Sequence, residues 1–153
     1  MHNTQTHAEK IKTTQINIDN TFLYADLSYK IIGCFYEIRN QYGPGQKEIV
    51  YKNALAEKLL KLNLRIAIEK RIPVKSKDTN KTLGIYQPDI IVENKIIIEI
   101  KSSSYISKLD EKQLYFYLRN SEYQVGFIVN FSTPGLFFKR IIYSNRYKFK
   151  AVT

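Results

Sequence analysis

A carboxylate inside an isoleucine-rich segment is the feature that most constrains this chain. Residues 96–101 read Ile-Ile-Ile-Glu-Ile-Lys, a nearly continuous apolar run in which Glu99 is the exception. Such a run is typical of a central strand that is covered on both faces of a sheet. A buried carboxylate is costly unless it is paired, hydrogen-bonded or bound to a cation. Glu99 therefore needs a partner elsewhere in the chain.

The segment just upstream offers Asp89 as that partner. Asp89 begins a second apolar run, and residues 93–95, Glu-Asn-Lys, form a natural turn between the two runs. In an antiparallel hairpin centred on Asn94, residues equally far from Asn94 face each other, and this pairs Asp89 with Glu99. Directly opposed side chains lie roughly 5 Å apart at Cβ, so the two carboxylates can share one hard cation. Lys101, two residues beyond Glu99, points to the same face.

Two carboxylates beside an ammonium are the groups that phosphodiester hydrolysis needs. Asp89 and Glu99 would hold Mg²⁺ or Mn²⁺, which neutralises charge and activates a water. Lys101 can orient or deprotonate that water, or stabilise the charge of the transition state, and the sequence does not separate these roles. The alternative is an ordinary salt-bridged hairpin, in which Lys101 pairs with Asp89 or Glu99.

Two helices are expected before the strands, separated by Gly43-Pro44-Gly45. The second extends to about Leu62, with an apolar stripe at helical spacing. Glu48 continues this stripe one turn upstream, which predicts that Glu48 points towards the sheet. A carboxylate that complements the dipole at the helix N-terminus is the alternative. The stripe consists of Tyr51, Leu55, Leu59 and Leu62.

A later helix, for which Ser107 is a candidate cap, adds two more polar side chains. Gln113 and Tyr117 are four residues apart and share a face, where they can bind a phosphate or the metal-bound water. Core packing is the alternative role of Tyr117. The Gln113–Tyr117 pair therefore extends the candidate site onto this helix.

The strand pattern predicts an α/β fold with a mixed sheet and helices packed against it. The helix after Ser107 separates two strands and predicts a right-handed crossover between a parallel pair. A polar loop is expected over residues 75–82. The strand-like runs lie at 65–72, 85–92, 96–101, 124–131 and about 136–143.

Composition narrows the partners. The chain has 24 Lys and Arg residues against 14 Asp and Glu residues, and the formal charge of +10 favours polyanions such as nucleic acid. Cys34 lies among apolar residues and is expected to be a buried thiol, whereas His2 and His7 lack any metal-ligand pattern. No signal peptide and no apolar run of roughly 18 residues is present, so we expect a cytoplasmic protein without a membrane partner. The oligomeric state is unknown from the sequence.

Three motifs together resemble a known family. Gly45, Glu48 and Tyr51 form G-x-x-E-x-x-Y, and Pro88-Asp89 followed by Glu99-Ile100-Lys101 forms PD-(D/E)XK. The Gln113-x-x-x-Tyr117 element resembles the Q-x-x-x-Y motif of the exonuclease-like branch. Over roughly residues 27–147 the chain resembles the GxxExxY family of the PD-(D/E)XK nuclease superfamily. The lack of a cysteine cluster separates it from the iron–sulfur relatives.

This resemblance implies a restriction-endonuclease-like core of helix-β-β-β-helix-β with an extra N-terminal helix. The core would span residues 22–148, between a polar N-terminal tail at 1–21 and a C-terminal tail at 149–153. The resemblance also implies that Glu48, Asp89 and Glu99 surround the metal and that the Ile100 carbonyl is a further ligand. Because a fold does not establish activity, a catalytically silent nucleic-acid- or protein-binding module is the alternative.

Overall fold

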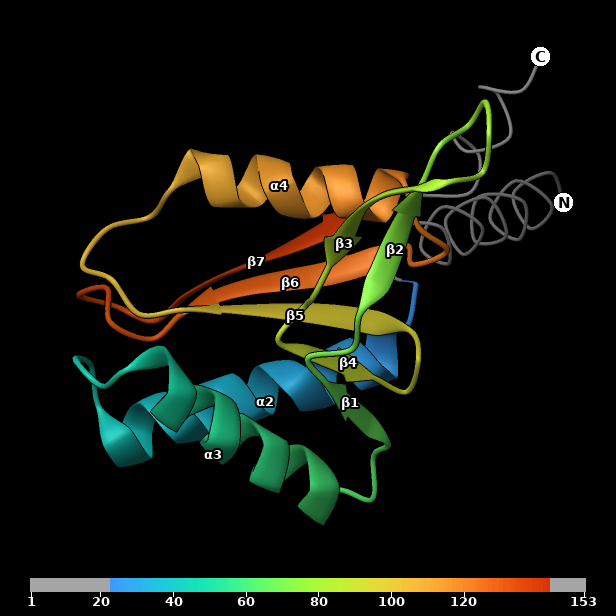
Figure 1. The fold of residues 1–153 in the computed structure, drawn as a ribbon. Helices are drawn as coiled ribbons and strands as arrows, with labels where there is room; N and C mark the ends of the chain where they lie inside the picture. The colour runs from blue at the N-terminus through green and yellow to red at the C-terminus, as the bar shows by residue number, and fades with distance from the viewer. Residues whose placement is uncertain (1–22, 144–153) are drawn as a thin grey trace, which may run out of the picture. The chain divides into compact units, whose positions relative to one another are not determined.

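A mixed five-stranded sheet organises the chain, whose computed structural model describes residues 23–143 (Figure 1). Contacts divide the chain into two units, Met1–Lys30 and Ile31–Thr153, and the sheet lies entirely in the second. The second unit is described here by itself. The predicted tails, the domain boundaries at 22 and 148, and His2 and His7 lie outside the described residues.

The strand order of the sheet is β1-β4-β5-β6-β7. The central pair β5–β6 is parallel, as the crossover pattern predicts, and the other neighbours are antiparallel. This arrangement confirms the predicted mixed α/β fold. The bounds are Ile66–Ile68 for β1, Ile90–Val92 for β4, Ile96–Lys101 for β5, Val125–Asn130 for β6 and Phe137–Ile142 for β7.

Helix α3 (Glu48–Lys61) follows α2 (Ala25–Tyr42) and buries its apolar stripe against the sheet. Tyr51 stacks on Phe131 at a centroid distance of 4.6 Å. The stripe ends earlier than expected, because Leu62 is 43% exposed. Cys34 is buried, as predicted. Within residues 23–143, no helix is both long enough and apolar enough to span a bilayer.

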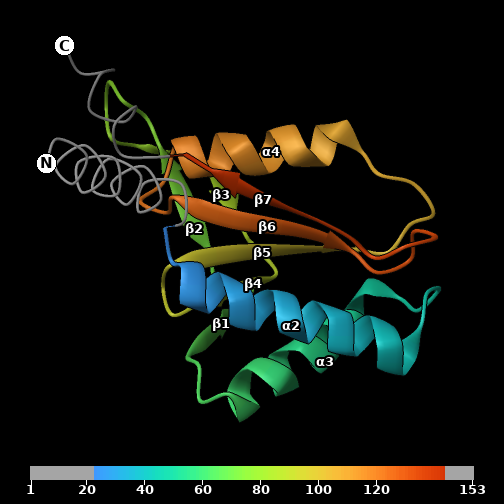
Figure 2. The same cartoon turned by 180° about the vertical axis from the view of Figure 1, so that it is seen from behind.

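Helix α4 (Lys108–Arg119) packs closely on the other side of the central strands, as Figure 2 also shows from behind. Leu114 and Leu118 lie in one apolar cluster with Ile97. A Cβ on Gly126 would come within 3.0 Å of a Leu114 methyl, so the missing side chain lets helix and strand approach. Ser107 precedes α4 as expected but makes no side-chain capping hydrogen bond.

Two expected strands are each broken in two, which corrects the predicted boundaries. The run 65–72 is interrupted by Glu69, whose φ of 52° cannot continue a strand. The run 85–92 is interrupted at Gln87-Pro88, where proline provides no ladder donor. The residues beyond these two interruptions belong to a separate antiparallel hairpin, formed by β2 (Ile72–Lys75) and β3 (Thr82–Tyr86). The expected polar loop is therefore the end of a hairpin.

Candidate active site

The β4–β5 hairpin has the predicted register. Ile90 pairs with Ile98 and Val92 with Ile96 across a turn that contains Asn94. Extending this register by one position places Asp89 opposite Glu99. The backbone ladder ends at Ile90, so Asp89 lies just beyond the last pair. Apolar burial has fixed the register, since a shift by one residue would turn every isoleucine to the opposite face.

The Asp89 carboxylate is held at the end of β4 by the backbone of β5. Its Oδ2 accepts a hydrogen bond of 2.7 Å from the Ile100 amide. Its Oδ1 lies 3.8 Å from the Lys52 ammonium, and the side chain is 25% exposed. Asp89 is therefore oriented by the strand but still open to solvent.

Glu99 is a half-buried carboxylate in the middle of β5. Burial raises the pKa of Glu99 to about 7, and the negative charge of Asp89 also raises it, while a hydrogen bond from the Tyr86 hydroxyl lowers it. The Tyr86 ring stacks on Tyr117 with the centroids 3.3 Å apart. Burial and the neighbouring Glu99 raise the pKa of Tyr86, so this hydroxyl keeps its proton and donates. Near neutral pH, Glu99 therefore either holds a proton or needs a cation.

A polar pocket of about 260 Å³ adjoins Glu99 and contains three other predicted site residues, Lys101, Gln113 and Tyr117. Gln113 Nε2 lies 3.4 Å from the Tyr117 hydroxyl, so the expected shared face of α4 is formed. Lys101 Nζ lies 3.8 Å from Asp110 Oδ1, an ion pair to α4 rather than within the hairpin. The structure thus brings these side chains together around one cavity.

Glu48 has a different environment. It is the first residue of α3 and is exposed. Tyr51, the last position of G-x-x-E-x-x-Y, fixes the turn before the helix: its hydroxyl donates to the Gly43 carbonyl at 2.6 Å and accepts from the Gln46 amide at 3.1 Å. Among residues 23–143, no three His, Cys, Asp or Glu side chains gather closely enough to hold a metal. A role of Glu48 as a third ligand stays a prediction.

Lys52 is a neighbour of the site that the motifs did not predict. Lys52 Nζ lies 2.5 Å from Glu69 Oε1, and its side chain is only 12% exposed. The hydrogen bond to Glu69 raises the pKa of Lys52, and the charges of Asp89 and Glu48 add to this. Its position one helical turn after Glu48 was the available signal. Tyr86 and Asp110 gave no such signal, since their roles depend on tertiary packing.

The donor set suits Mg²⁺ or Mn²⁺. Both are hard cations that prefer oxygen ligands, and Mg²⁺ usually takes one or two carboxylates together with waters and substrate phosphate. Asp89 and Glu99 supply two carboxylates, and burial, which raises the pKa of Glu99, makes its charged form costly unless a cation balances it. The residues present therefore fit a cation that is completed by water and substrate.

Comparisons with known proteins identify the superfamily of this chain. The family model described as the PD-(D/E)XK nuclease superfamily matches residues 25–141. A solved structure described as "Crystal structure of SSO0001" is similar with 17% identity and a TM-score of 0.40, covering 77% of this chain and 66% of that chain. No curated protein gives a significant match. The match over residues 25–141 shows that this chain belongs to the PD-(D/E)XK nuclease superfamily.

Proposed function

We propose that this chain is a Mg²⁺- or Mn²⁺-dependent nuclease of the GxxExxY branch. The observation that carries the proposal is the opposed placement of Asp89 and Glu99, with Lys101 in the pocket that adjoins Glu99. Two carboxylates next to a cationic side chain match the needs of phosphodiester hydrolysis. The net charge of +10 favours a nucleic-acid substrate.

In this proposal Asp89 and Glu99 are the metal ligands, and the Ile100 carbonyl and Glu48 are further candidates. The bound cation would polarise the phosphate and lower the pKa of a water. Glu99 must lose its proton to bind it, while Tyr86 keeps that carboxylate oriented through its hydrogen bond.

On the substrate side, Lys101 would contact a phosphate oxygen and stabilise the charge that develops there. Gln113 and Tyr117 supply neutral donors on the pocket wall formed by α4. The pocket can thus hold one phosphate between β5 and α4.

A catalytically silent binding module is the second candidate, and the Lys52–Asp89 ion pair favours it. Lys52 supplies positive charge beside Asp89 without a metal. Such a module would bind nucleic acid, or a protein, equally well with and without divalent cations. Metal dependence therefore separates the two candidates.

The test is incubation of labelled single- and double-stranded DNA and RNA with Mg²⁺, Mn²⁺ or chelator. Glu99→Gln is compared with Glu122→Gln, which neutralises an exposed carboxylate outside the pocket. We expect cleavage that chelator abolishes, that Glu99→Gln abolishes and that Glu122→Gln preserves. Binding without cleavage of any substrate, unchanged by metal, would replace the nuclease with the binding module.

A further inference from the structure

The β2–β3 hairpin and the residues that lead into it, Lys70 and Arg71, carry an excess of positive charge. Residues 69–82 contain five basic side chains and two acidic ones, and all five basic residues are exposed. One of the acids, Glu69, is already paired with Lys52. The excess positive charge therefore faces solvent. The basic residues are Lys70, Arg71, Lys75, Lys77 and Lys81.

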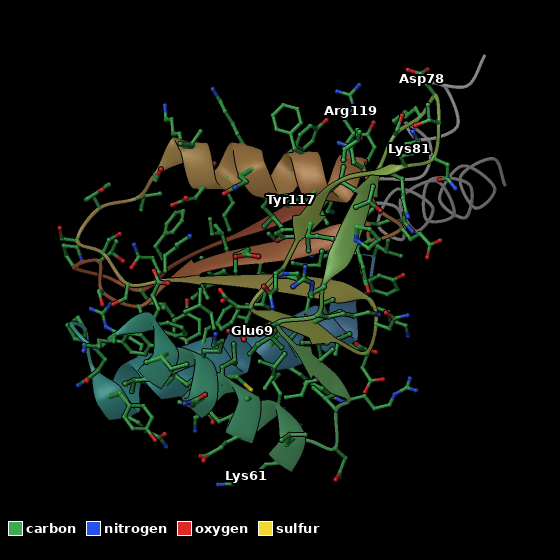
Figure 3. All side chains as sticks on the ribbon, in the orientation of Figure 1. Lys61, Glu69, Asp78, Lys81, Tyr117 and Arg119 are labelled. Atoms are coloured by element: carbon green, nitrogen blue, oxygen red, sulfur yellow. The ribbon has the colours of Figure 1, made fainter. Side chains whose placement is uncertain are left out.

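This hairpin is physically joined to the candidate site at its base. Ile85 and Tyr86, at the end of β3, line the same pocket as Glu99. Tyr86 also donates a hydrogen bond to Glu99, so the last residue of the β2–β3 hairpin contacts a proposed metal ligand. In Figure 3, Asp78 and Lys81 lie at the far end of the hairpin, away from Glu69 at its base. A molecule that follows the hairpin is thereby led to the pocket.

We infer that the β2–β3 hairpin is a cationic ribbon that docks on duplex DNA and guides its backbone to the Glu99 pocket. The inference deepens the proposed nuclease function and rests on it for the role of the pocket. Lys77 and Lys81 bind phosphates near the tip, and the ribbon between them and Tyr86 lies along the groove. Five residues of strand span roughly 16 Å at about 3.3 Å per residue, which sets the reach of this contact.

The shape of the hairpin favours a duplex over a single strand. The major groove of B-DNA is roughly 12 Å wide and admits a two-stranded ribbon, whereas the major groove of A-form RNA is too narrow for side chains to read. One face of β3 suits such a groove: Leu83 and Ile85, two residues apart and therefore on the same side of the strand, are 71% and 45% exposed. Apolar side chains such as leucine can contact thymine methyl groups there.

Single-strand binding requires exposed aromatic rings on which bases stack. Tyr86 is the only aromatic residue in 69–86, and its ring is buried against Tyr117. The hairpin therefore offers charge and an open apolar surface but no stacking platform. This combination fits the backbone and groove of a duplex.

The test measures binding separately from cleavage. The full chain and a Lys77→Gln/Lys81→Gln variant are titrated, in chelator, with one DNA sequence as duplex and as single strand over a salt series. The control, Lys61→Gln/Lys112→Gln, removes two exposed lysines of α3 and α4. Because Lys75 donates to Thr82 within the hairpin at 3.0 Å, it is left unchanged. Melting temperatures verify that all variants fold.

We expect the hairpin variant to lose duplex affinity by on the order of tenfold or more, and the slope of log affinity against log salt to fall by about 1.8. The control should keep most of its affinity, and the duplex should bind more tightly than the single strand. Equal losses in hairpin and control variants, or tighter binding of the single strand, would overturn the inference. If duplex binding depends on the hairpin but no metal-dependent cleavage occurs, the DNA-docking role stands and the nuclease function is excluded. The two proposals can therefore fail separately.

Discussion

The two hairpins of this protein follow one another in the chain but differ in almost every physical respect. The β4–β5 hairpin is built of isoleucines that are almost completely buried, and it belongs to the main sheet. The β2–β3 hairpin forms its own two-stranded sheet, and most of its residues are exposed, among them Lys75, Lys77 and Lys81. One hairpin thus fixes carboxylates in place, while the other presents positive charge to solvent.

The difference shows how each kind of environment shapes function. Burial on both faces sets the β4–β5 register, and that register makes the placement of Asp89 and Glu99 accurate. In the exposed hairpin the register shifts between Val74 and Lys75. A fixed register therefore suits the chemistry proposed for the buried hairpin, and an exposed charged surface suits the binding proposed for the other.

The largest expected effect is on the cleavage rate, and it should distinguish a lysine of one hairpin from a lysine of the other. Lys101→Ala should lower the cleavage rate by about a thousandfold, because it removes a positioned charge from the pocket, while leaving nucleic-acid affinity nearly unchanged. Lys81→Ala should do the reverse and weaken binding more than turnover at saturating substrate. Single-turnover kinetics measure both. Near-normal turnover in Lys101→Ala would exclude it as a catalytic group.

The next effect concerns stability. Ile98→Ala removes a fully buried side chain from β5 and should lower the free energy of unfolding by about 2 to 5 kcal/mol. Leu83→Ala, at a position 71% exposed on β3, should change it by less than about 0.5 kcal/mol. Urea unfolding of both variants gives the comparison. A similar loss in the two would contradict the contrast between the hairpins.

The sequence predicted the buried hairpin well because its determinants are local. The isoleucine runs and the turn at residues 93–95 specify strands, register and face without reference to the rest of the fold. The register confirmed in the structure follows directly from them. The same holds for the parallel β5–β6 pair, which the intervening helix requires.

The exposed hairpin and the neighbours of the site were not predictable in this way. Glu69 adopts a left-handed conformation that its residue type does not reveal, so β1 and β2 were merged into one expected strand. Asp110 comes close to the site only through tertiary packing, and the one sequence signal for Lys52 was its position one helical turn after Glu48. Leu62 belongs to the apolar stripe by spacing but lies beyond the end of α3, where it is exposed. The spacing of apolar and polar residues along the sequence carries little information on long-range contacts or on the backbone angle of a single residue.

A third effect, of about 3 kcal/mol, is the pH dependence of the buried hairpin. Because Glu99 has a pKa of about 7 in the fold, against an unfolded value near its usual range, its protonated form stabilises the protein. This contribution is complete below about pH 4.5 and is lost as the pH rises through 7. In chelator, the free energy of unfolding of the unmodified protein, measured relative to that of Glu99→Gln, should therefore fall between pH 5 and pH 8. Asp78→Asn, in the exposed hairpin, should follow the original, and a flat difference for Glu99→Gln would contradict the assignment.

The smallest effect is the response to divalent metal, and it should be confined to the buried hairpin. A ligand that binds only the native state stabilises it by RT ln(1 + [L]/Kd), so Mg²⁺ at about ten times its Kd should contribute roughly 1.4 kcal/mol. The contribution should be larger at pH 8 than at pH 5.5, because Glu99 must be ionised to bind. Melting temperature reports the total. Hydrogen exchange shows where the stabilisation acts. The Ile100 amide, bonded to Asp89, should be protected, whereas the Ser76 amide, bonded to the Lys81 carbonyl, should exchange as before.

Glu99→Gln should weaken the metal response while leaving the metal-free protein at pH 8 as stable as the unmodified protein or more so, since it removes a buried charge. If no metal shifts the melting of the original, and Glu99→Gln is clearly less stable in chelator, then Glu99 is a structural partner of its neighbours and the binding module replaces the nuclease.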